Sequence, residues 1–167
     1  MRAMKSKVVA AIGAAIFCLL LVLPERGTAE VASPAEKVGF DVLGGFDYEG
    51  KATGPNGRGV TGTIPEAVRA LNGRRVEVAG YIMPIDIDER GVRSFALIKD
   101  QASCCFGQAP RINHWVYVTL KGRPLREIDF EPKRVVGTLT VGEYYDQGYL
   151  VCLYRMTGEM VGKEPPR

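Results

Sequence analysis

The chain has 167 residues, of which 46% are hydrophobic and 25% are charged. This is enough for one ordinary globular domain, and it excludes a disordered or fibrous protein. The net charge of +3 comes from residues 1–29, because the rest of the chain keeps 18 of the 22 basic and 18 of the 19 acidic residues. A neutral domain lacks the basic surface that nucleic-acid binding needs, so we expect no nucleic-acid partner.

The N-terminal segment has the three parts of a signal peptide. A basic region at 1–7 precedes an uncharged run at 8–23, and Gly27-Thr28-Ala29 provides the small residues that a signal peptidase requires. The uncharged run is shorter than the roughly 20 residues of a membrane-spanning helix. We therefore expect cleavage after Ala29, no permanent membrane anchor, and a periplasmic or secreted protein in an oxidising compartment.

Residues 30–62 are predicted to be an extended lead-in that ends in a glycine-rich loop, Gly54–Gly62. Within the lead-in, the apolar and aromatic stretch Phe40–Tyr48 is expected to dock on the domain that follows. The glycine-rich loop is not a phosphate-binding loop, since it does not end in Gly-Lys-Ser/Thr.

A short α-helix is predicted over residues 63–72. Thr63 and Glu66 have the spacing of a capping box, and Asn72-Gly73 is a typical helix end. Between these signals an apolar stripe faces the core, made of Ile64, Val68 and Leu71.

Alternation of apolar and polar residues predicts five strands after the helix, at 75–83, 92–98, 113–120, 134–141 and 149–156. The acidic residues just before Gly91 predict a solvated hairpin turn, and residues 159–167 are expected to be a flexible tail. The predicted fold is mainly β, a small five-stranded OB-like barrel over 63–158 with one short N-terminal α-helix. A small sandwich and an SH3-like barrel are the alternatives.

The most unusual stretch lies between the second and third predicted strands. Residues 102–115 hold Cys104, Cys105, and the only histidine and tryptophan of the chain, His114 and Trp115. Connecting loops carry binding residues more often than core elements do, so we expect this loop to be the binding surface. Its other expected members are Phe106, Gly107, Gln108, Pro110, Arg111 and Asn113.

Three interpretations of the cysteines stay open, and they involve a third cysteine, Cys152, in the last strand. A disulfide from Cys104 or Cys105 to Cys152 would close a loop of roughly 50 residues and stabilise the fold by about 4 kcal/mol. Cys104, Cys105, Cys152 and His114 could together bind zinc or copper, although adjacent cysteines lack the usual two-residue spacing. A labile Cys104–Cys105 disulfide could take part in thiol exchange.

Hydrolytic catalysis is disfavoured, because no serine outside the signal peptide lies in a Gly-x-Ser-x-Gly motif. An enzyme hypothesis therefore rests on the cysteines alone.

Five segments resemble a family of exported bacterial proteins of unknown function, DUF3299. They are Leu43–Tyr48, Val78–Pro84, Phe95–Ile98, Cys104–Asn113 and Val141–Glu143, and the resemblance spans residues 40–158. It implies a periplasmic or lipid-anchored accessory protein without an established active site, encoded in some bacteria beside transporters linked to metal supply. This chain departs from the family at its two adjacent cysteines, where other members often have one cysteine followed by a proline-rich loop.

The sequence thus favours a non-catalytic, exported binding or accessory module that acts through the 102–115 loop. Its expected partner is an envelope protein or a transporter component, with a link to metal handling. The alternatives are a thiol-redox or metal-dependent envelope enzyme and a structural protein stapled by a disulfide.

Overall fold

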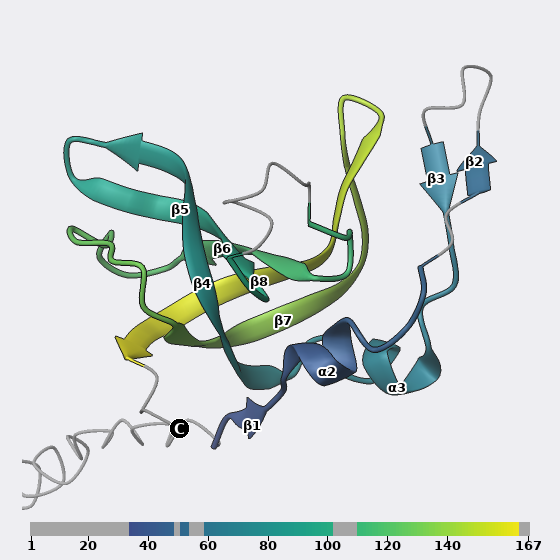
Figure 1. Ribbon diagram of the computed structural model, residues 1–167, viewed down its shortest axis with the longest axis horizontal. Helices are drawn as coiled ribbons and strands as arrows, with labels where there is room; N and C mark the ends of the chain where they lie inside the picture. Colours follow the sequence, from purple (N-terminus) through teal and green to yellow (C-terminus); the bar gives the residue numbers. More distant parts are fainter. Residues whose placement is uncertain (1–33, 49–50, 54–58, 102–109, 164–167) are drawn as a thin grey trace, which may run out of the picture. The chain divides into compact units, whose positions relative to one another are not determined.

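The structure is a computed structural model that describes residues 34–48, 51–53, 59–101 and 110–163 (Figure 1). The predicted signal peptide, the last four residues and positions 102–109 of the predicted binding loop lie outside the described residues. No helix in the described part of the chain is both long and apolar enough to cross a membrane.

All five predicted strands are present, and the mainly β architecture is confirmed. They pair in the order β4–β5–β6–β8–β7, and β7 pairs back with β4, so that the pairings form a closed ring. Every contact in this ring is antiparallel except that between β6 and β8, which is parallel. The strands are β4 (Arg75–Asp88), β5 (Gly91–Ile98), β6 (Trp115–Leu120), β7 (Lys133–Asp146) and β8 (Tyr149–Lys163).

The core follows the alternation of the strands. On β6 the side chains of Val116, Val118 and Leu120 are buried, while those of Trp115 and Tyr117 are half-buried. Successive side chains of a strand point to opposite faces, so one face of each strand packs inside the ring. Strand β4 alternates in the same way, since Val76 and Val78 are buried while Arg75 and Glu77 are half-buried.

Four strands are longer than predicted, β5 by one residue only, while β6 starts two residues later than expected. Register shifts along β7, with Gly142 at φ 152°, let it continue to Asp146, and β8 continues to Lys163. The prediction of a flexible tail from residue 159 is wrong for 159–163, because β7 supplies backbone hydrogen-bond partners up to the Lys133–Lys163 pair. An exposed side chain such as Met160 gave no sequence signal of this pairing.

The predicted helix is shorter than expected and starts differently. Helix α3 covers Glu66–Arg69. Its N-cap residue is Pro65, whose carbonyl oxygen accepts hydrogen bonds from the amides of Val68 and Arg69. No side chain caps the helix, so the capping box at Thr63 is wrong. Proline fixes φ near the helical value and lacks an amide, which places a helix start there. The apolar stripe itself is confirmed, since Ile64, Val68 and Leu71 are buried.

The region before α3 holds more structure than the predicted lead-in. A second helix, α2 (Phe40–Leu43), buries Phe40 and Leu43 as expected of a docked stretch. The short strand β1 (Glu36–Lys37) pairs in parallel with β4. Strands β2 (Lys51–Thr53) and β3 (Gly59–Thr61) form a small antiparallel pair, so the glycine-rich segment is partly a strand.

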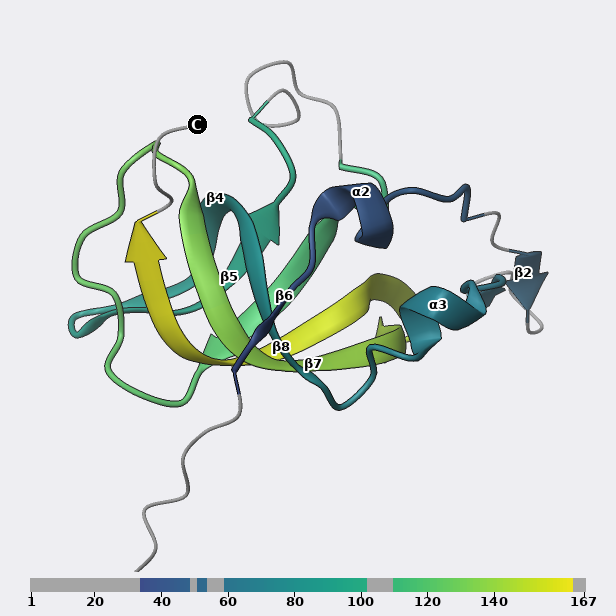
Figure 2. The same ribbon diagram turned by 90° about the horizontal axis from the view of Figure 1, so that it is seen from below.

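Two parts of the domain lie at opposite ends of the strand ring in both views. The β4–β5 hairpin and the connection 121–132 lie side by side at one end, while α2 and α3 lie at the other (Figures 1 and 2). The predicted hairpin turn before Gly91 is confirmed, because β4 ends at Asp88 and pairs there with Gly91.

Candidate functional site

Residues 44–48, which follow α2, form a docked segment that holds the end of the predicted binding loop. The side-chain amide of Asn113 donates a hydrogen bond to the Phe46 carbonyl oxygen at 2.6 Å. The guanidinium of Arg111 forms an ion pair with Asp47. Just before the segment, at the end of α2, the Leu43 carbonyl oxygen accepts a hydrogen bond from the Tyr154 hydroxyl of β8 at 2.7 Å. The base of the loop is therefore fixed by backbone and side-chain contacts.

His114 lies directly against this segment. A Cβ atom on Gly44 would lie 2.6 Å from His114 Cδ2, so only glycine fits at position 44. The His114 amide donates to the Arg111 carbonyl oxygen at 2.8 Å, and the Lys99 amide donates to the His114 carbonyl oxygen at 3.0 Å. Burial, together with the positive charge of Lys99, lowers the pKa of His114. The imidazole is consequently neutral at pH 7.

Asn113 carries the one unsatisfied buried side-chain atom found in the described part of the chain. Asn113 is 1% exposed, and its Oδ1 has no hydrogen-bond partner among the residues that the structure describes. The amide orientation is set by the Phe46 carbonyl oxygen, which can only accept a hydrogen bond. An unpaired buried acceptor costs about 1–3 kcal/mol. Asn113 therefore holds, just before β6, a buried acceptor without a donor among the described residues.

Glu143 ties the docked segment to β7. Its Oε1 accepts hydrogen bonds from the Tyr48 hydroxyl at 2.5 Å and the Gly62 amide at 2.9 Å. Its Oε2 accepts one from the Tyr145 hydroxyl at 2.9 Å. Burial acts to raise the pKa of Glu143, but the hydrogen bonds from Tyr48, Gly62 and Tyr145 outweigh it and lower the pKa. Burial and the neighbouring Glu143 carboxylate raise the pKa of Tyr48.

Segments that carry the family resemblance meet at this place. Tyr48 and Glu143 come from two of them, and Asn113 ends a third. Gly80, from a fourth, lies so close to α2 that an added Cβ would be 3.1 Å from Phe40 Cε2 and 2.6 Å from the Ile98 carbonyl oxygen. Sequence reasoning missed Tyr48 and Glu143 as site residues, although both lie in segments that carry the family resemblance.

The described residues account for only part of the predicted cysteine site. Cys152 is a free cysteine with a fully buried side chain, and burial raises the pKa of its thiol to about 11. Cys104, Cys105, Phe106, Gly107 and Gln108 lie outside the described residues. Pro110 and Trp115 are half-buried at the base of the loop.

Within the described ranges, no three His, Cys, Asp or Glu side chains are grouped as a metal site would require. The disulfide, the metal site and the redox pair each need a cysteine outside these ranges. They therefore stay predictions.

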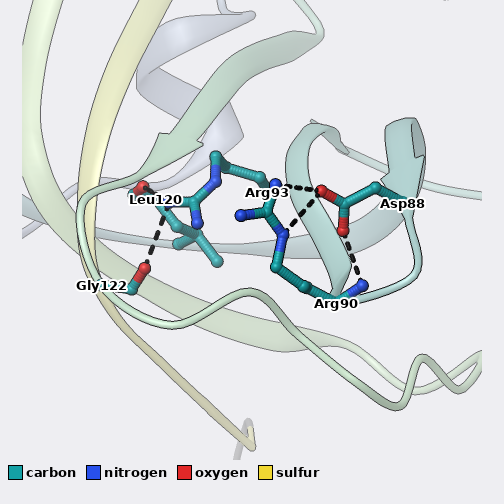
Figure 3. Close-up of polar contacts among 5 residues, drawn as sticks. All are labelled: Asp88, Arg90, Arg93, Leu120 and Gly122. Carbon is teal, nitrogen blue, oxygen red and sulfur yellow. Dashed lines mark hydrogen bonds and ion pairs between the residues drawn. The ribbon is translucent and has the colours of Figure 1, made fainter.

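A second surface, which sequence reasoning missed, lies at the end of the β4–β5 hairpin. Figure 3 shows the polar contacts that order it: Arg93 donates to the carbonyl oxygens of Leu120 and Gly122 at 3.4 and 3.3 Å, and Asp88 accepts from Arg90 at 2.8 Å. The hairpin and the connection 121–132, which follows β6, line an open cleft of about 480 Å³. Its lining residues are Ile87, Asp88, Glu89, Arg90, Gly91, Val92, Leu125, Arg126 and Ile128.

The family model of DUF3299, described as a protein of unknown function, matches residues 58–163. The chain belongs to this family. A solved relative is the crystal structure of a DUF3299 family protein from Pseudomonas aeruginosa PAO1, with 22% sequence identity and a TM-score of 0.56. The match covers 80% of the present chain and 99% of that protein. No protein with a curated description matches the chain.

The similarity to the Pseudomonas DUF3299 protein shows that the two share a fold. It also indicates that this fold spans nearly the whole of that relative. The expected family resemblance is confirmed, and with it the mainly β architecture.

Proposed function

We propose that this DUF3299 protein is an exported, non-catalytic binding module that contacts an envelope protein, such as a transporter component, through its 102–115 loop. The observation that carries the proposal is the anchored base of that loop. Arg111, Asn113 and His114 each contact the docked segment 44–48, so the loop starts from a fixed platform. Binding loops on rigid scaffolds are a common arrangement, because the scaffold limits the entropy lost on binding.

The same proposal treats the strand ring as an OB-like barrel. Five strands closed on themselves, with one parallel contact between β6 and β8, fit the small Greek-key barrels that present ligand-binding loops. In such a barrel the loop between β5 and β6 would be one of the variable connections.

A role without catalysis is supported by the chemistry of the described residues. The Glu143 carboxylate is engaged by three donors, and its pKa is lowered, so it is a poor proton donor or acceptor at neutral pH. The thiol of Cys152, with a pKa of about 11, is almost entirely protonated at pH 7 and is a weak nucleophile. Both groups therefore act as structural groups.

A link to zinc or copper stays part of the proposal through the loop cysteines. The neutral imidazole of His114 has the protonation state that a metal ligand needs. Cys104, Cys105 and Cys152 would have to supply the thiolates, and for Cys152 the metal would have to overcome the raised pKa of the buried thiol.

Site-specific photo-crosslinking in cells that export the protein tests the partner hypothesis. A crosslinker at Gln108, inside the loop, is compared with one at Thr119, an exposed position of β6. We expect a discrete envelope-protein adduct from position 108 only, and a weaker adduct when Asn113→Ala loosens the base of the loop. Equal adducts from both positions, or none from position 108, would rule out the loop as the binding surface.

Native mass spectrometry with and without a thiol-alkylating reagent distinguishes the remaining alternatives. A bound zinc or copper ion with all three thiols protected would support metal handling. One disulfide without metal would support the stapled structural protein, and a disulfide that exchanges with added thiol would support the redox enzyme. The same spectrum tests cleavage after Ala29.

A further inference from the structure

The docked segment 44–48 is attached to the domain differently from the chain just before it. Upstream, the attachment is made by the backbone: β1 pairs with β4, and the Val38 amide donates to the Glu77 carbonyl oxygen at 2.9 Å. Among the described residues, no backbone-to-backbone hydrogen bond joins positions 45–48 to another part of the chain. Side chains therefore make the attachment there, and a segment held in this way opens more easily than a paired strand.

A fixed point and a hinge precede this segment. The Leu43 side chain is fully buried, and its carbonyl oxygen accepts a hydrogen bond from the Tyr154 hydroxyl. Gly44 and Gly45 follow directly, and glycine adopts a wider range of backbone conformations than other residues do. The chain can therefore turn at the two glycines while α2 stays in place.

Two of the contacts beyond the hinge are modest. The side chains of the Asp47–Arg111 ion pair are 80% and 55% exposed, and ion pairs at such exposure contribute little to stability. The Phe46 carbonyl oxygen accepts a hydrogen bond from the side-chain amide of Asn113, and neither of these groups is charged. Both contacts reach the base of the predicted binding loop, so the position of the segment and that of the loop base depend on each other.

The Glu143 carboxylate makes the strongest contact. Its Oε1 accepts hydrogen bonds from the Tyr48 hydroxyl at 2.5 Å and the Gly62 amide at 2.9 Å, which lie on the two sides of the β2–β3 pair in the chain. Hydrogen bonds to a charged group are roughly twice as strong as those between neutral groups. Burial acts to raise the pKa of Glu143, but its hydrogen bonds outweigh burial and lower the pKa. The carboxylate is consequently charged at pH 7.

We propose that the docked segment is a strap that opens and closes at Glu143, and that Glu143 positions the base of the predicted binding loop through this strap. In the closed form the Tyr48 hydroxyl is bound to Glu143, and the segment holds Arg111 and Asn113. In the open form the segment moves about Gly44–Gly45 and releases both loop residues. The consequence for binding rests on the proposed function of the loop, whereas the strap itself does not.

Two variants that each lose one hydroxyl separate the strap from other effects of Glu143. Tyr48→Phe removes the hydrogen bond that closes the strap and keeps the aromatic ring, which packs against the core. Tyr145→Phe is the matched control, because it removes a hydroxyl that donates to the other oxygen of the same carboxylate from within β7. Glu143→Gln should act in the same direction as Tyr48→Phe.

Limited proteolysis with chymotrypsin measures the opening of the strap. This protease cleaves after aromatic residues, and Phe46 is half-buried in the closed form, whereas Phe130 is 91% exposed and provides an internal reference. We expect Tyr48→Phe to raise the rate of cleavage after Phe46, relative to that after Phe130, by about tenfold or more. Tyr145→Phe should leave this ratio within about twofold of the wild-type value.

Amide hydrogen exchange followed by NMR measures whether the strap positions the loop. The His114 amide donates to the Arg111 carbonyl oxygen at 2.8 Å, within the base of the loop. Tyr48→Phe should speed the exchange of this amide by at least about threefold, while amides in the middle of the strand ring keep their wild-type rates. In the crosslinking experiment the same variant should weaken the adduct from position 108, and Tyr145→Phe should leave it unchanged.

Three outcomes would overturn the proposal. Equal cleavage ratios in Tyr48→Phe and Tyr145→Phe would exclude the strap, and faster cleavage with an unchanged His114 amide would exclude the positioning role of Glu143. Circular dichroism that showed Tyr48→Phe to be unfolded would make the segment an integral part of the core instead. Proteolysis and hydrogen exchange need no partner, so both decide on the strap even if no adduct forms at position 108 and the loop is not the binding surface.

Discussion

At the end of α2, just before the docked segment, Leu43 is fully buried and its carbonyl oxygen accepts a hydrogen bond from Tyr154, whereas at the hairpin end Ile87 and Phe130 are largely exposed. Both regions are well ordered by hydrogen bonds. They differ in where the apolar side chains go: into the core at the first region and into solvent at the second. Burial stabilises a fold, and ordered exposure prepares a surface for binding. Substitutions at the two regions should therefore change different measurements.

The largest loss of stability is expected at α2, which leads into the docked segment. Leu43→Ala removes a fully buried side chain and leaves a cavity, which should lower the free energy of unfolding by about 2–5 kcal/mol. Chemical denaturation measures this loss. Val42→Ala, at the exposed neighbouring position of α2, is the control and should change stability by less than about 0.5 kcal/mol. Similar losses from both variants would mean that α2 does not dock as described.

A backbone change at the hairpin end should rank next. Gly91→Ala forces an alanine to φ 121° and brings its Cβ against the Leu125 carbonyl oxygen. We expect a loss of about 1–3 kcal/mol and faster proteolysis within 121–132, because the Val92–Leu125 hydrogen bonds must separate. Gly122→Ala has no heavy atom within 4 Å of its added Cβ and should be nearly neutral. Unchanged proteolysis in Gly91→Ala would show that the connection is not held by these bonds.

Glu143→Gln removes the negative charge that accepts hydrogen bonds from Tyr48, Gly62 and Tyr145, at a cost of about 1–3 kcal/mol at pH 7. The pKa of Glu143 is below its ordinary value of 4.5 in the folded protein, so its contribution is present above the unfolded pKa. That contribution is lost as the pH falls through the folded pKa. The difference between wild type and variant should therefore shrink in acid, as denaturation at pH 7 and below pH 4.5 would show.

Glu127→Gln is the matched control for this pH dependence, because Glu127 is exposed and no hydrogen bond or ion pair joins its side chain to the described residues. Its stability should follow that of the wild type at each pH. If Glu143→Gln kept a constant difference at every pH, the carboxylate would not be the stabilising group.

The smallest effect on stability is expected from the exposed apolar residues of the hairpin end. Ile87→Ser and Phe130→Ser should each change the free energy of unfolding by less than about 0.5 kcal/mol, since neither side chain is in the core. Any effect of these substitutions should appear in binding at this surface and not in stability. A large loss of stability in either variant would show that these side chains pack inside the fold, and the contrast between the two regions would disappear.

Some features were predictable from the sequence because their signals are local. Alternation placed the five strands, and the spacing of Ile64, Val68 and Leu71 identified the buried side of α3. The start of α3 was predictable only in part, since Thr63 and Pro65 give competing signals and the fixed backbone of proline decided between them.

The candidate site was predictable to a smaller extent. The unusual loop pointed to Arg111, Asn113 and His114, and all three lie at the docked segment. Glu143 and Tyr48 are separated by 95 residues, and no local pattern relates a carboxylate to a hydroxyl at that separation. The exposed Ile87 also has the sequence pattern of an ordinary strand residue.

Local sequence patterns specify the mainly β composition, the strand positions and the family, because hydrophobic periodicity and short motifs are properties of neighbouring residues. Three further features are visible in the folded domain alone: β7 pairs back with β4, residues 44–48 meet Asn113 and Glu143, and the hairpin end faces the connection 121–132 across a cleft. Each of these depends on contacts between distant parts of the chain. Such contacts form where packing and backbone hydrogen bonding of the whole domain are satisfied together.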